Sequence, residues 1–318
     1  MTEPKHLILL GPTGTIGRAV LQQALADGLQ VTCVTRRSSA LPEGVAQVAV
    51  DLADPLAVRQ ALAGLGADAV LSCMASRNGS AQDAWAVDHR AQLHVLDAAK
   101  AAGIAQFVLL SAICVQKPLL EFQRAKLAFE TALQRSGLEW SIVRPTAFFK
   151  SLSGQVARVQ AGKPFLLFGD GELTACKPIS DRDLARYLLD CLMLPDRWGR
   201  VLPIGGPGPA LTPRDQGEML FELAGKPAQF RRVPVALMDG IIALLSGLGR
   251  VSGQMAAKAE FARIGRYYAT ESMLVWDAET GRYDADATPE FGTDSLCDHY
   301  AAMLRGDRRA DLGEHAVF

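Results

Sequence analysis

The sequence has few features of a protein held together by metals or disulfides. Its six cysteines stand at positions 33, 73, 114, 176, 191 and 297, and no two of them have the C-x-x-C spacing of a zinc ligand pair. The five histidines form no H-x-x-x-H pair. We therefore expect no metal site in the protein, and we predict reduced thiols.

An excess of charge of one sign is also lacking. The 33 basic and 34 acidic side chains give a formal net charge of -1, which argues against a nucleic-acid partner. The longest apolar stretch, Val235 to Leu248, contains Asp239 and is shorter than the roughly 20 residues of a transmembrane helix. The N-terminal residues fit no signal peptide, so we expect a cytoplasmic protein.

The first half of the chain alternates short apolar runs with segments of helical spacing, a pattern typical of a parallel sheet covered on both faces. We predict an α/β fold with a doubly wound parallel sheet of the Rossmann type. The predicted core spans 1–150. Residues 151–318 form a mixed segment, which returns to the core at about 181–225 and ends in a smaller C-terminal lobe that binds substrate. The predicted strands are His6–Leu10, Val31–Val34, Val45–Val50, Ala69–Cys73, Phe107–Leu110, Trp140–Val143 and Arg200–Ile204; the predicted helices include Ile16–Ala26, Ala84–Ala102, Leu120–Ser136, Asp181–Leu194 and one opened by Thr212 and Pro213.

A glycine-rich turn joins the first predicted strand to the first helix. Gly11, Gly14 and Gly17 have the spacing G-x-x-G-x-x-G, and Thr13, Thr15 and Ile16 lie between them. Glycines let the backbone approach a pyrophosphate closely, and the helix N-terminus attracts its negative charge. The turn predicts a dinucleotide site; the alternative is an ordinary strand-to-helix turn.

The end of the second strand indicates which dinucleotide binds. An NAD site places an acidic residue about twenty residues after the glycines, whereas this chain has Arg36 and Arg37. Two guanidinium groups bind a 2′-phosphate, which favours NADPH; the alternative is a solvated basic turn. The doubly wound layout adds further cofactor contacts after the third, fourth and sixth strands: Asp51, Leu52, Met74, Ala75, Ser76 and Pro145. Asp51 could equally cap a helix.

This organisation resembles the atypical short-chain dehydrogenase/reductases. Those enzymes carry a Tyr-x-x-x-Lys pair on the helix after the fifth strand and a serine at the end of that strand. Ser111 and Lys126 match, but Phe122 stands where the tyrosine would be. A phenol that protonates a carbonyl oxygen is therefore absent, which argues against ordinary alcohol–ketone chemistry. Lys126 could still bind the nicotinamide ribose and serve the cofactor, and its alternative is a solvated helix lysine.

Longer motifs resemble one family within that group, the NADPH-dependent divinyl chlorophyllide 8-vinyl reductases. The resemblance extends over nearly the whole chain, from about residue 6 to 305. The family itself lacks the tyrosine, and the short N-terminus favours a bacterial member without a transit peptide. The motifs that carry the resemblance are Leu109–Lys126, Arg144–Leu152, Phe168–Gly171, Ala175–Ser180, Leu202–Gly208 and Gly265–Met273.

The resemblance implies reduction of the 8-vinyl group of a magnesium chlorin or porphyrin to ethyl. The substrate is a flat apolar disc with a propionate, so its pocket needs apolar walls and a cation. We predict Lys126 as proton source, with Cys114 or Lys117 as weaker candidates and Ser111 as a further catalytic residue. The predicted substrate contacts are Phe122, Phe148, Phe149, Lys150, Lys177 and Arg266, with core packing or a surface or structural charge as alternatives.

Three other functions are compatible with the sequence. The chain could be a non-catalytic NADP(H)-binding regulator or redox sensor, an assembly subunit, or a reductase of another conjugated double bond. Packing is the expected role of the helix near Ile241–Leu248, with covering the chlorin, an interface or membrane contact as alternatives. Peripheral association with a photosynthetic membrane is compatible with the expected cytoplasmic location.

Overall fold

The computed structural model describes residues 5–77, 80–250 and 252–307. The chain forms two compact units. The first comprises residues up to Ser76, Ala81–Arg144 and Asp181–Leu202; the second contains Arg77–Ser80, Pro145–Ser180 and the chain from Pro203 onward.

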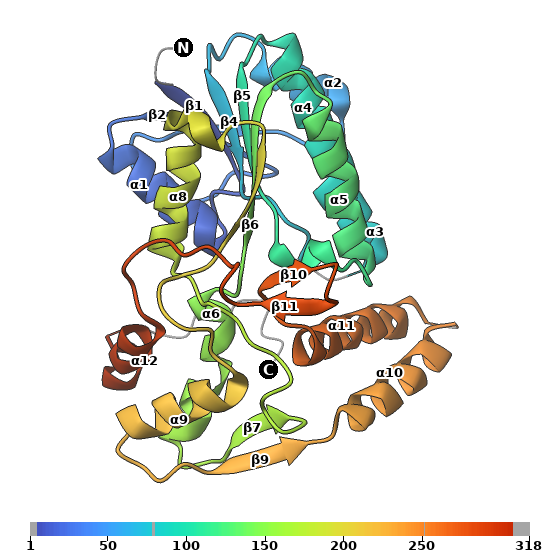
Figure 1. The fold of residues 1–318 in the computed structure, drawn as a ribbon. Coiled ribbons are helices and arrows are strands. Elements are labelled where there is room, and N and C mark those ends of the chain that lie inside the picture. The colour runs from blue at the N-terminus through green and yellow to red at the C-terminus, as the bar shows by residue number, and fades with distance from the viewer. Residues whose placement is uncertain (1–4, 78–79, 251, 308–318) are drawn as a thin grey trace. The chain divides into compact units, whose positions relative to one another are not determined.

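A seven-stranded sheet forms the centre of the first unit, in the order β3-β2-β1-β4-β5-β6-β8 (Figure 1). The neighbouring strands from β3 to β6 pair in parallel. The chain passes from β3 at one edge back to β4 beside β1, so the strand order reverses between β1 and β4, and this is the switch point at which such sheets bind ligands. The predicted doubly wound parallel sheet is confirmed. The strands are β1 (His6–Leu10), β2 (Gln30–Thr35), β3 (Ala46–Ala49), β4 (Ala69–Ser72), β5 (Gln106–Leu110), β6 (Glu139–Pro145) and β8 (Arg200–Ile204).

Helices cover both faces of this sheet (Figure 1). On one face α1 (Thr15–Ala26) packs against α8 (Asp181–Met193). On the other, α2 (Pro55–Leu62), α4 (Gln92–Ala101) and α5 (Glu121–Gln134) enclose an apolar core with the strands. Every residue of β1, β4 and β5 is buried, which explains why these strands are apolar except at His6, Ser72 and Gln106.

The helix predicted over Ala84–Ala102 is interrupted. It consists of α3 (Ala81–Ala84), a π-helical segment η1 (Trp85–Ala91) and α4. A π-helix has a wider turn than an α-helix and occurs mostly as single turns, frequently at functional sites. The apolar spacing gave no sign of this widening.

The second unit has its own core and two small sheets. Its core is built around Tyr300, Phe149 and Phe165, and β7 pairs with β9 in parallel while β10 and β11 form an antiparallel hairpin. Thr212 caps α9 as expected, since its Oγ1 accepts a hydrogen bond from the Asp215 backbone N–H at 3.2 Å. The elements are α6 (Phe149–Leu152), η3 (Ser153–Gln155), α7 (Val156–Gln160), β7 (Phe165–Phe168), α9 (Pro213–Leu223), β9 (Phe230–Val233), α10 (Val235–Gly249), α11 (Gly253–Thr270), β10 (Val275–Asp277), β11 (Arg282–Asp284) and α12 (Leu296–Arg305); the short 3-10 helices η2 (Ile113–Gln116) and η4 (Pro195–Arg197) belong to the first unit.

Helices α9 and α10 both belong to the second unit. The last segment of the first unit ends at Leu202, so α9 belongs to the second unit. The helix near Ile241–Leu248 is α10; it packs against α11, as expected, but none of its residues is fully buried. Among the helices of residues 5–77, 80–250 and 252–307, none has the length and apolarity to cross a membrane.

Candidate functional site

The glycine turn after β1 is shaped by close backbone contacts. Gly11 has a φ of +72°, and a Cβ there would lie 2.8 Å from the Cys73 carbonyl oxygen, in the loop after β4. A Cβ on Gly17 would lie 2.0 Å from the Gly11 carbonyl oxygen. Both positions therefore require glycine for the fold itself. The loops after β1 and β4 meet at the switch point of the sheet.

Gly14 differs from its two neighbours. A Cβ at this position would have an ordinary contact of 3.5 Å with the Gly11 carbonyl oxygen as its nearest contact, so the protein itself has room for a methyl group. Gly14 is the N-cap of α1, where no side chain supplies a capping hydrogen bond and the first turn carries no acidic residue. A phosphate at this helix N-terminus would gain from the dipole and the close backbone approach. The turn thus fits a dinucleotide pyrophosphate.

The remaining residues of the turn belong to its local framework. Thr13 and Thr15 are half-buried, and Ile16 is buried in the first turn of α1. Their predicted contact with the cofactor stays a prediction.

The loops after β2 and β3 place the other cofactor candidates in different environments. Arg36 and Arg37 are exposed directly after β2, and across the described part of the chain neither forms an ion pair. Both guanidinium groups can therefore meet an anion. Asp51 is exposed and accepts a hydrogen bond from the Ala53 backbone N–H at 3.0 Å, whereas Leu52 is a core residue. The N-cap of α2 is Asp54, not Asp51.

One buried carboxylate joins two residues that the sequence assigned to the cofactor. Asp88 Oδ1 accepts a hydrogen bond from Lys126 Nζ at 2.9 Å, and Asp88 Oδ2 accepts one from Ser76 Oγ at 2.6 Å. The side chain of Asp88 is fully buried, and that of Lys126 is 13% exposed. Lys126 is therefore held in an ion pair, and it is not the solvated helix lysine that its position alone allowed.

The π-helical segment η1 supplies Asp88 and is fixed to α5 at a second point. Trp85 Nε1 donates a hydrogen bond to Glu121 Oε2 at 2.9 Å, and this bond is the main cause of a lowered pKa at Glu121. Sequence reasoning missed Asp88. The sequence offered no distinguishing signal, because the same helical segment carries other polar residues such as Asp83, His89 and Arg90, and the pattern does not show which of them is buried.

Met74 and Ala75 complete the loop between β4 and Ser76. Met74 is half-buried, and its carbonyl oxygen accepts a hydrogen bond from Gln92 Nε2 at 3.5 Å. Ala75 is exposed. Pro145 is buried at the end of β6.

Ser111 faces a second buried carboxylate. Its Oγ donates to Glu130 Oε1 at 2.5 Å, and Glu130 also forms an ion pair with Arg144. The hydroxyl is therefore engaged with the protein. Cys114 is buried in η2, and its carbonyl oxygen accepts a hydrogen bond from Gln123 Nε2 at 3.0 Å.

The predicted substrate contacts fall into two groups. Phe122, Phe148 and Lys150 are half-buried, and Phe122 precedes Lys126 by one helical turn on α5. Phe149 is a core residue of the second unit, with its ring centroid 5.3 Å from that of His299. The half-buried group keeps surface for a ligand, whereas Phe149 contacts the chain's own side chains.

The two candidate partners of the propionate are already paired with carboxylates. Lys177 is buried, and its Nζ donates to Glu290 Oε1 at 2.6 Å and to the Thr288 carbonyl oxygen at 3.3 Å. Lys177 also lowers the pKa of Glu290, chiefly through that hydrogen bond. Arg266, on α11, forms an ion pair with Asp239 on α10. A substrate carboxylate would have to replace these partners.

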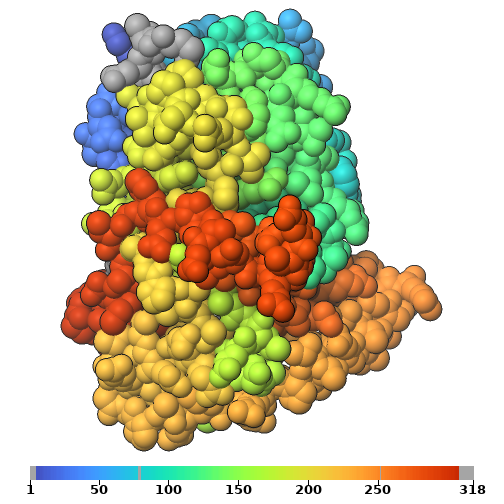
Figure 2. Space-filling view, in the orientation of Figure 1, coloured from blue at the N-terminus to red at the C-terminus, as the bar shows by residue number. Residues whose placement is uncertain are grey.

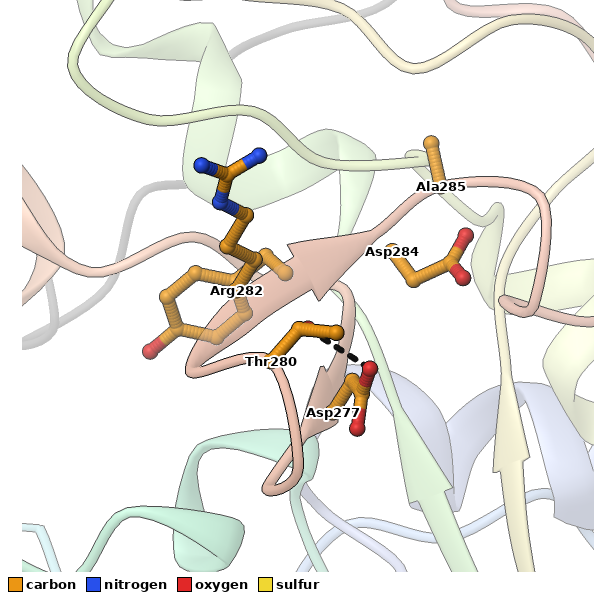
Figure 3. A pocket seen from close by; sticks show the side chains of 6 residues that line it. Asp277, Thr280, Arg282, Asp284 and Ala285 are labelled. Atoms are coloured by element: carbon orange, nitrogen blue, oxygen red, sulfur yellow. Dashed lines mark hydrogen bonds between the residues drawn. The ribbon is translucent and has the colours of Figure 1, made fainter.

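An open depression of about 530 Å³ lies on the β10–β11 hairpin (Figure 3). Asp277 accepts hydrogen bonds from the Glu279 backbone N–H at 2.9 Å and Thr280 Oγ1 at 2.6 Å, and the Thr280 bond is the main cause of its lowered pKa. Its carboxylate therefore stabilises the turn. In the described ranges, no three His, Cys, Asp or Glu side chains are grouped so that they could hold a metal ion.

Comparison with known proteins identifies the relatives of this site. The NAD(P)H-binding family matches residues 11–195, which include the glycine turn, Asp88 and Lys126. The divinyl chlorophyllide a 8-vinyl-reductase of Zea mays, described as chloroplastic, is 49% identical over 98% of this chain and 82% of its own. The chain belongs to the divinyl chlorophyllide a 8-vinyl-reductase family. As a member of this family it binds a nicotinamide dinucleotide, in accordance with the fit of the glycine turn.

More distant similarities extend this result. The photosystem II assembly factor Ycf39 of Cyanophora paradoxa is 29% identical over 73% of this chain and 73% of its own. The structure of an NADPH-dependent quinone oxidoreductase from Escherichia coli with NADPH superimposes with a TM-score of 0.66, at 18% identity, over 94% of this chain and 99% of the other. At 18% identity, this similarity shows that the two chains share a fold and nothing more.

Proposed function

We propose that the protein is an NADPH-dependent reductase that converts the 8-vinyl group of divinyl (proto)chlorophyllide to ethyl. The observation that carries the proposal is the convergence of Ser76 and Lys126 on Asp88, in a chain 49% identical to a reductase of that name. The buried carboxylate holds the lysine in a fixed position beside the switch point, where a sheet of this type binds its cofactor.

The preference for NADPH over NADH rests on Arg36 and Arg37. Both lie exposed after β2, where a 2′-phosphate would be placed by the doubly wound layout. Each guanidinium can form two hydrogen bonds to one phosphate. No acidic residue stands beside them to accept a hydrogen bond from the ribose 2′-hydroxyl, as an NAD site requires.

When bound, NADPH supplies a hydride to the terminal carbon of the vinyl group. The negative charge then spreads into the macrocycle, and one proton is added at the inner carbon, so that the products are the ethyl group and NADP⁺. No oxyanion forms, which accounts for Phe122 in place of a tyrosine. The protein's tasks are alignment of the reactants and exclusion of water.

Lys126 serves this reaction as a positioned ammonium group. Its ion pair with Asp88 holds the ammonium group in place, where it can bind the nicotinamide ribose hydroxyls and stabilise negative charge that develops on the macrocycle. The same ammonium group is the proposed source of the proton, delivered directly or through water. Cys114, being buried, and Lys117 are weaker candidates for that role.

The macrocycle requires apolar contacts and a cation for the propionate. Phe122 and Phe148 supply half-buried aromatic surface, and Lys150 is a half-buried cation two residues after Phe148. Lys177 and Arg266 are weaker proposed partners of the propionate, because each would have to give up its present ion pair.

One observation favours a second function, an NADP(H)-binding assembly factor without turnover. The similarity to the photosystem II assembly factor is 29% over 73% of the chain. Such a protein would bind the dinucleotide and leave the pigment unchanged. The higher identity to the reductase, over a larger part of the chain, supports the enzyme.

The decisive experiment is a turnover assay with the purified full chain. Divinyl chlorophyllide and divinyl protochlorophyllide are each incubated with NADPH or NADH, and the loss of the 8-vinyl species is followed by chromatography. We expect conversion with NADPH and little with NADH, and a loss of that selectivity in the Arg36→Gln, Arg37→Gln double variant. Stoichiometric NADPH binding without conversion of either pigment would refute the reductase and favour the assembly factor.

A further inference from the structure

Helix α10 presents an apolar surface that the described chain leaves open. The side chains of Leu237, Ile241, Leu244 and Leu248 are 56%, 46%, 66% and 46% exposed. Their spacing of four, three and four residues aligns them along one face of the helix. Four exposed aliphatic side chains in one row exceed the scattered apolar residues of an ordinary surface.

The neighbouring strip of the same helix carries only small residues. Ala236, Gly240, Ala243 and Gly247 are all exposed. The half-buried residues, among them Met238, Ile242 and Leu245, lie to the other side of the aliphatic row, and α11 packs against α10. The exposed face is therefore broad and without charge, and Figure 2 shows its segment (orange) at the surface.

Basic residues stand at both ends of this face. Arg231 and Arg232 are exposed on β9 just before α10, and Arg250 is exposed just after it. Across the described part of the chain these three arginines form no ion pair. The single acidic residue of the helix, Asp239, is neutralised by Arg266. An apolar face with cations at both ends complements an anionic bilayer surface, with lipid tails in the middle and headgroups beyond.

Two other occupants fit this face less well. A second copy of the chain, paired parallel or antiparallel along α10, would bring arginines against arginines at both ends. A pigment needs a concave pocket, whereas this face is the convex side of a helix. The helix has 15 residues, about 22 Å at 1.5 Å per residue, so it is too short to span the roughly 30 Å of a hydrocarbon core and can lie in the interface.

We propose that α10 docks the protein on an anionic lipid bilayer, with Leu237, Ile241, Leu244 and Leu248 inserted among the acyl chains and Arg231, Arg232 and Arg250 on the headgroups. This docking is independent of the proposed reductase activity, because it uses no residue of the cofactor site.

The test is sedimentation of the full chain with vesicles of phosphatidylcholine alone or mixed with phosphatidylglycerol. We expect binding to the anionic vesicles that weakens as salt rises. The Ile241→Gln, Leu244→Gln double variant should bind about tenfold more weakly, because each lost apolar group removes part of the insertion free energy. The Arg231→Gln, Arg232→Gln double variant should lose about tenfold on anionic vesicles.

The control variant is Leu56→Gln, on α2. Leu56 is 62% exposed, close to the 66% of Leu244, and stands outside α10. It should leave vesicle binding unchanged. Circular dichroism and NADPH affinity, measured for each variant, establish that the fold is retained.

Three results would overturn the proposal. The wild-type chain could fail to bind either vesicle type, or the α10 variants could bind vesicles with the same affinity as the wild type. The chain could also form a lipid-free dimer that the Ile241→Gln, Leu244→Gln variant dissociates, as seen by sedimentation velocity. That last result would assign the face to a second copy.

Discussion

The ammonium group of Lys126 lies 2.9 Å from the carboxylate of Asp88, a residue 38 positions earlier in the chain. Because the Asp88 side chain is fully buried, its charge depends on Lys126 and on the Ser76 hydroxyl for compensation. The pair therefore fixes the lysine and joins η1, α5 and the loop after β4 at one point.

Asp88→Asn tests the role of this pair in the proposed reaction. The amide keeps the size of the side chain but removes the charge that orients Lys126. We expect kcat to fall by about tenfold to a hundredfold and KM for NADPH to rise severalfold, measured by pigment turnover. Lys126→Met should show a similar or larger loss, and Lys126→Arg should recover part of the NADPH affinity.

The matched control is Glu121→Gln, which weakens the other contact between η1 and α5 at Trp85 without touching Lys126. It should change stability more than kcat. If Asp88→Asn and Glu121→Gln have equal effects on stability and on kinetics, Asp88 acts only in folding. Unchanged turnover in Lys126→Met would remove Lys126 from the mechanism.

Gly14→Ala should separate cofactor binding from folding. The added methyl group meets the Gly11 carbonyl oxygen at 3.5 Å, an ordinary contact, so we expect the free energy of unfolding to change by no more than about 1 kcal/mol. The same methyl group occupies space at the phosphate position, and the Kd for NADPH should rise about tenfold or more. Fluorescence titration with NADPH and urea unfolding measure the two quantities.

Gly17→Ala is the companion variant, with the opposite expectation. Its Cβ would lie 2.0 Å from the Gly11 carbonyl oxygen, so the backbone must move and stability should fall by about 3 kcal/mol or more. Equal stability losses in the two variants would contradict the assignment of Gly14 to the ligand.

Lys177→Met tests whether this lysine is structural. The variant loses the hydrogen bonds to Glu290 and to the Thr288 carbonyl oxygen, while Glu290, 44% exposed, can turn to solvent. We expect a loss of about 1–3 kcal/mol in the free energy of unfolding, with KM for the pigment little changed. A large rise in that KM at unchanged stability would instead place Lys177 on the substrate propionate.

The burial of Cys33 predicts that the free energy of unfolding decreases at alkaline pH. Desolvation raises the pKa of this thiol from 9.0 to about 11. The unfolded chain therefore ionises first, so the stability that the neutral thiol contributes is complete below pH 9 and is lost as pH rises toward about 11. Urea unfolding at about pH 8 and about pH 10 should show a loss for wild type that exceeds that of Cys33→Ala by about 1 kcal/mol. Parallel losses in the two proteins would contradict burial as the cause.

Features that depend on neighbouring residues could be predicted from the sequence alone. The apolar run His6–Leu10, the glycines that follow it and the cap at Thr212 each specify local structure through steric or hydrogen-bonding preferences within a few residues. Because such elements alternate, the doubly wound sheet and its switch point followed from order alone. The longer motifs around Lys126 then indicated the family.

The pairing of charged side chains, in contrast, could be seen only in the folded protein. Asp88 lies in a π-helical turn and pairs with Lys126 across 38 residues, and no apolar period encodes either the widened turn or the pair. Glu290 neutralises Lys177 across 113 residues, and Asp239 neutralises Arg266 across 27, so two cations that the sequence offered to the substrate are occupied. Likewise, the exposed row on α10 became visible only when its packing was known, because an apolar sequence is the same for a buried helix and for an open one. Contacts between residues distant in sequence depend on how whole elements pack, and a linear pattern does not contain that information.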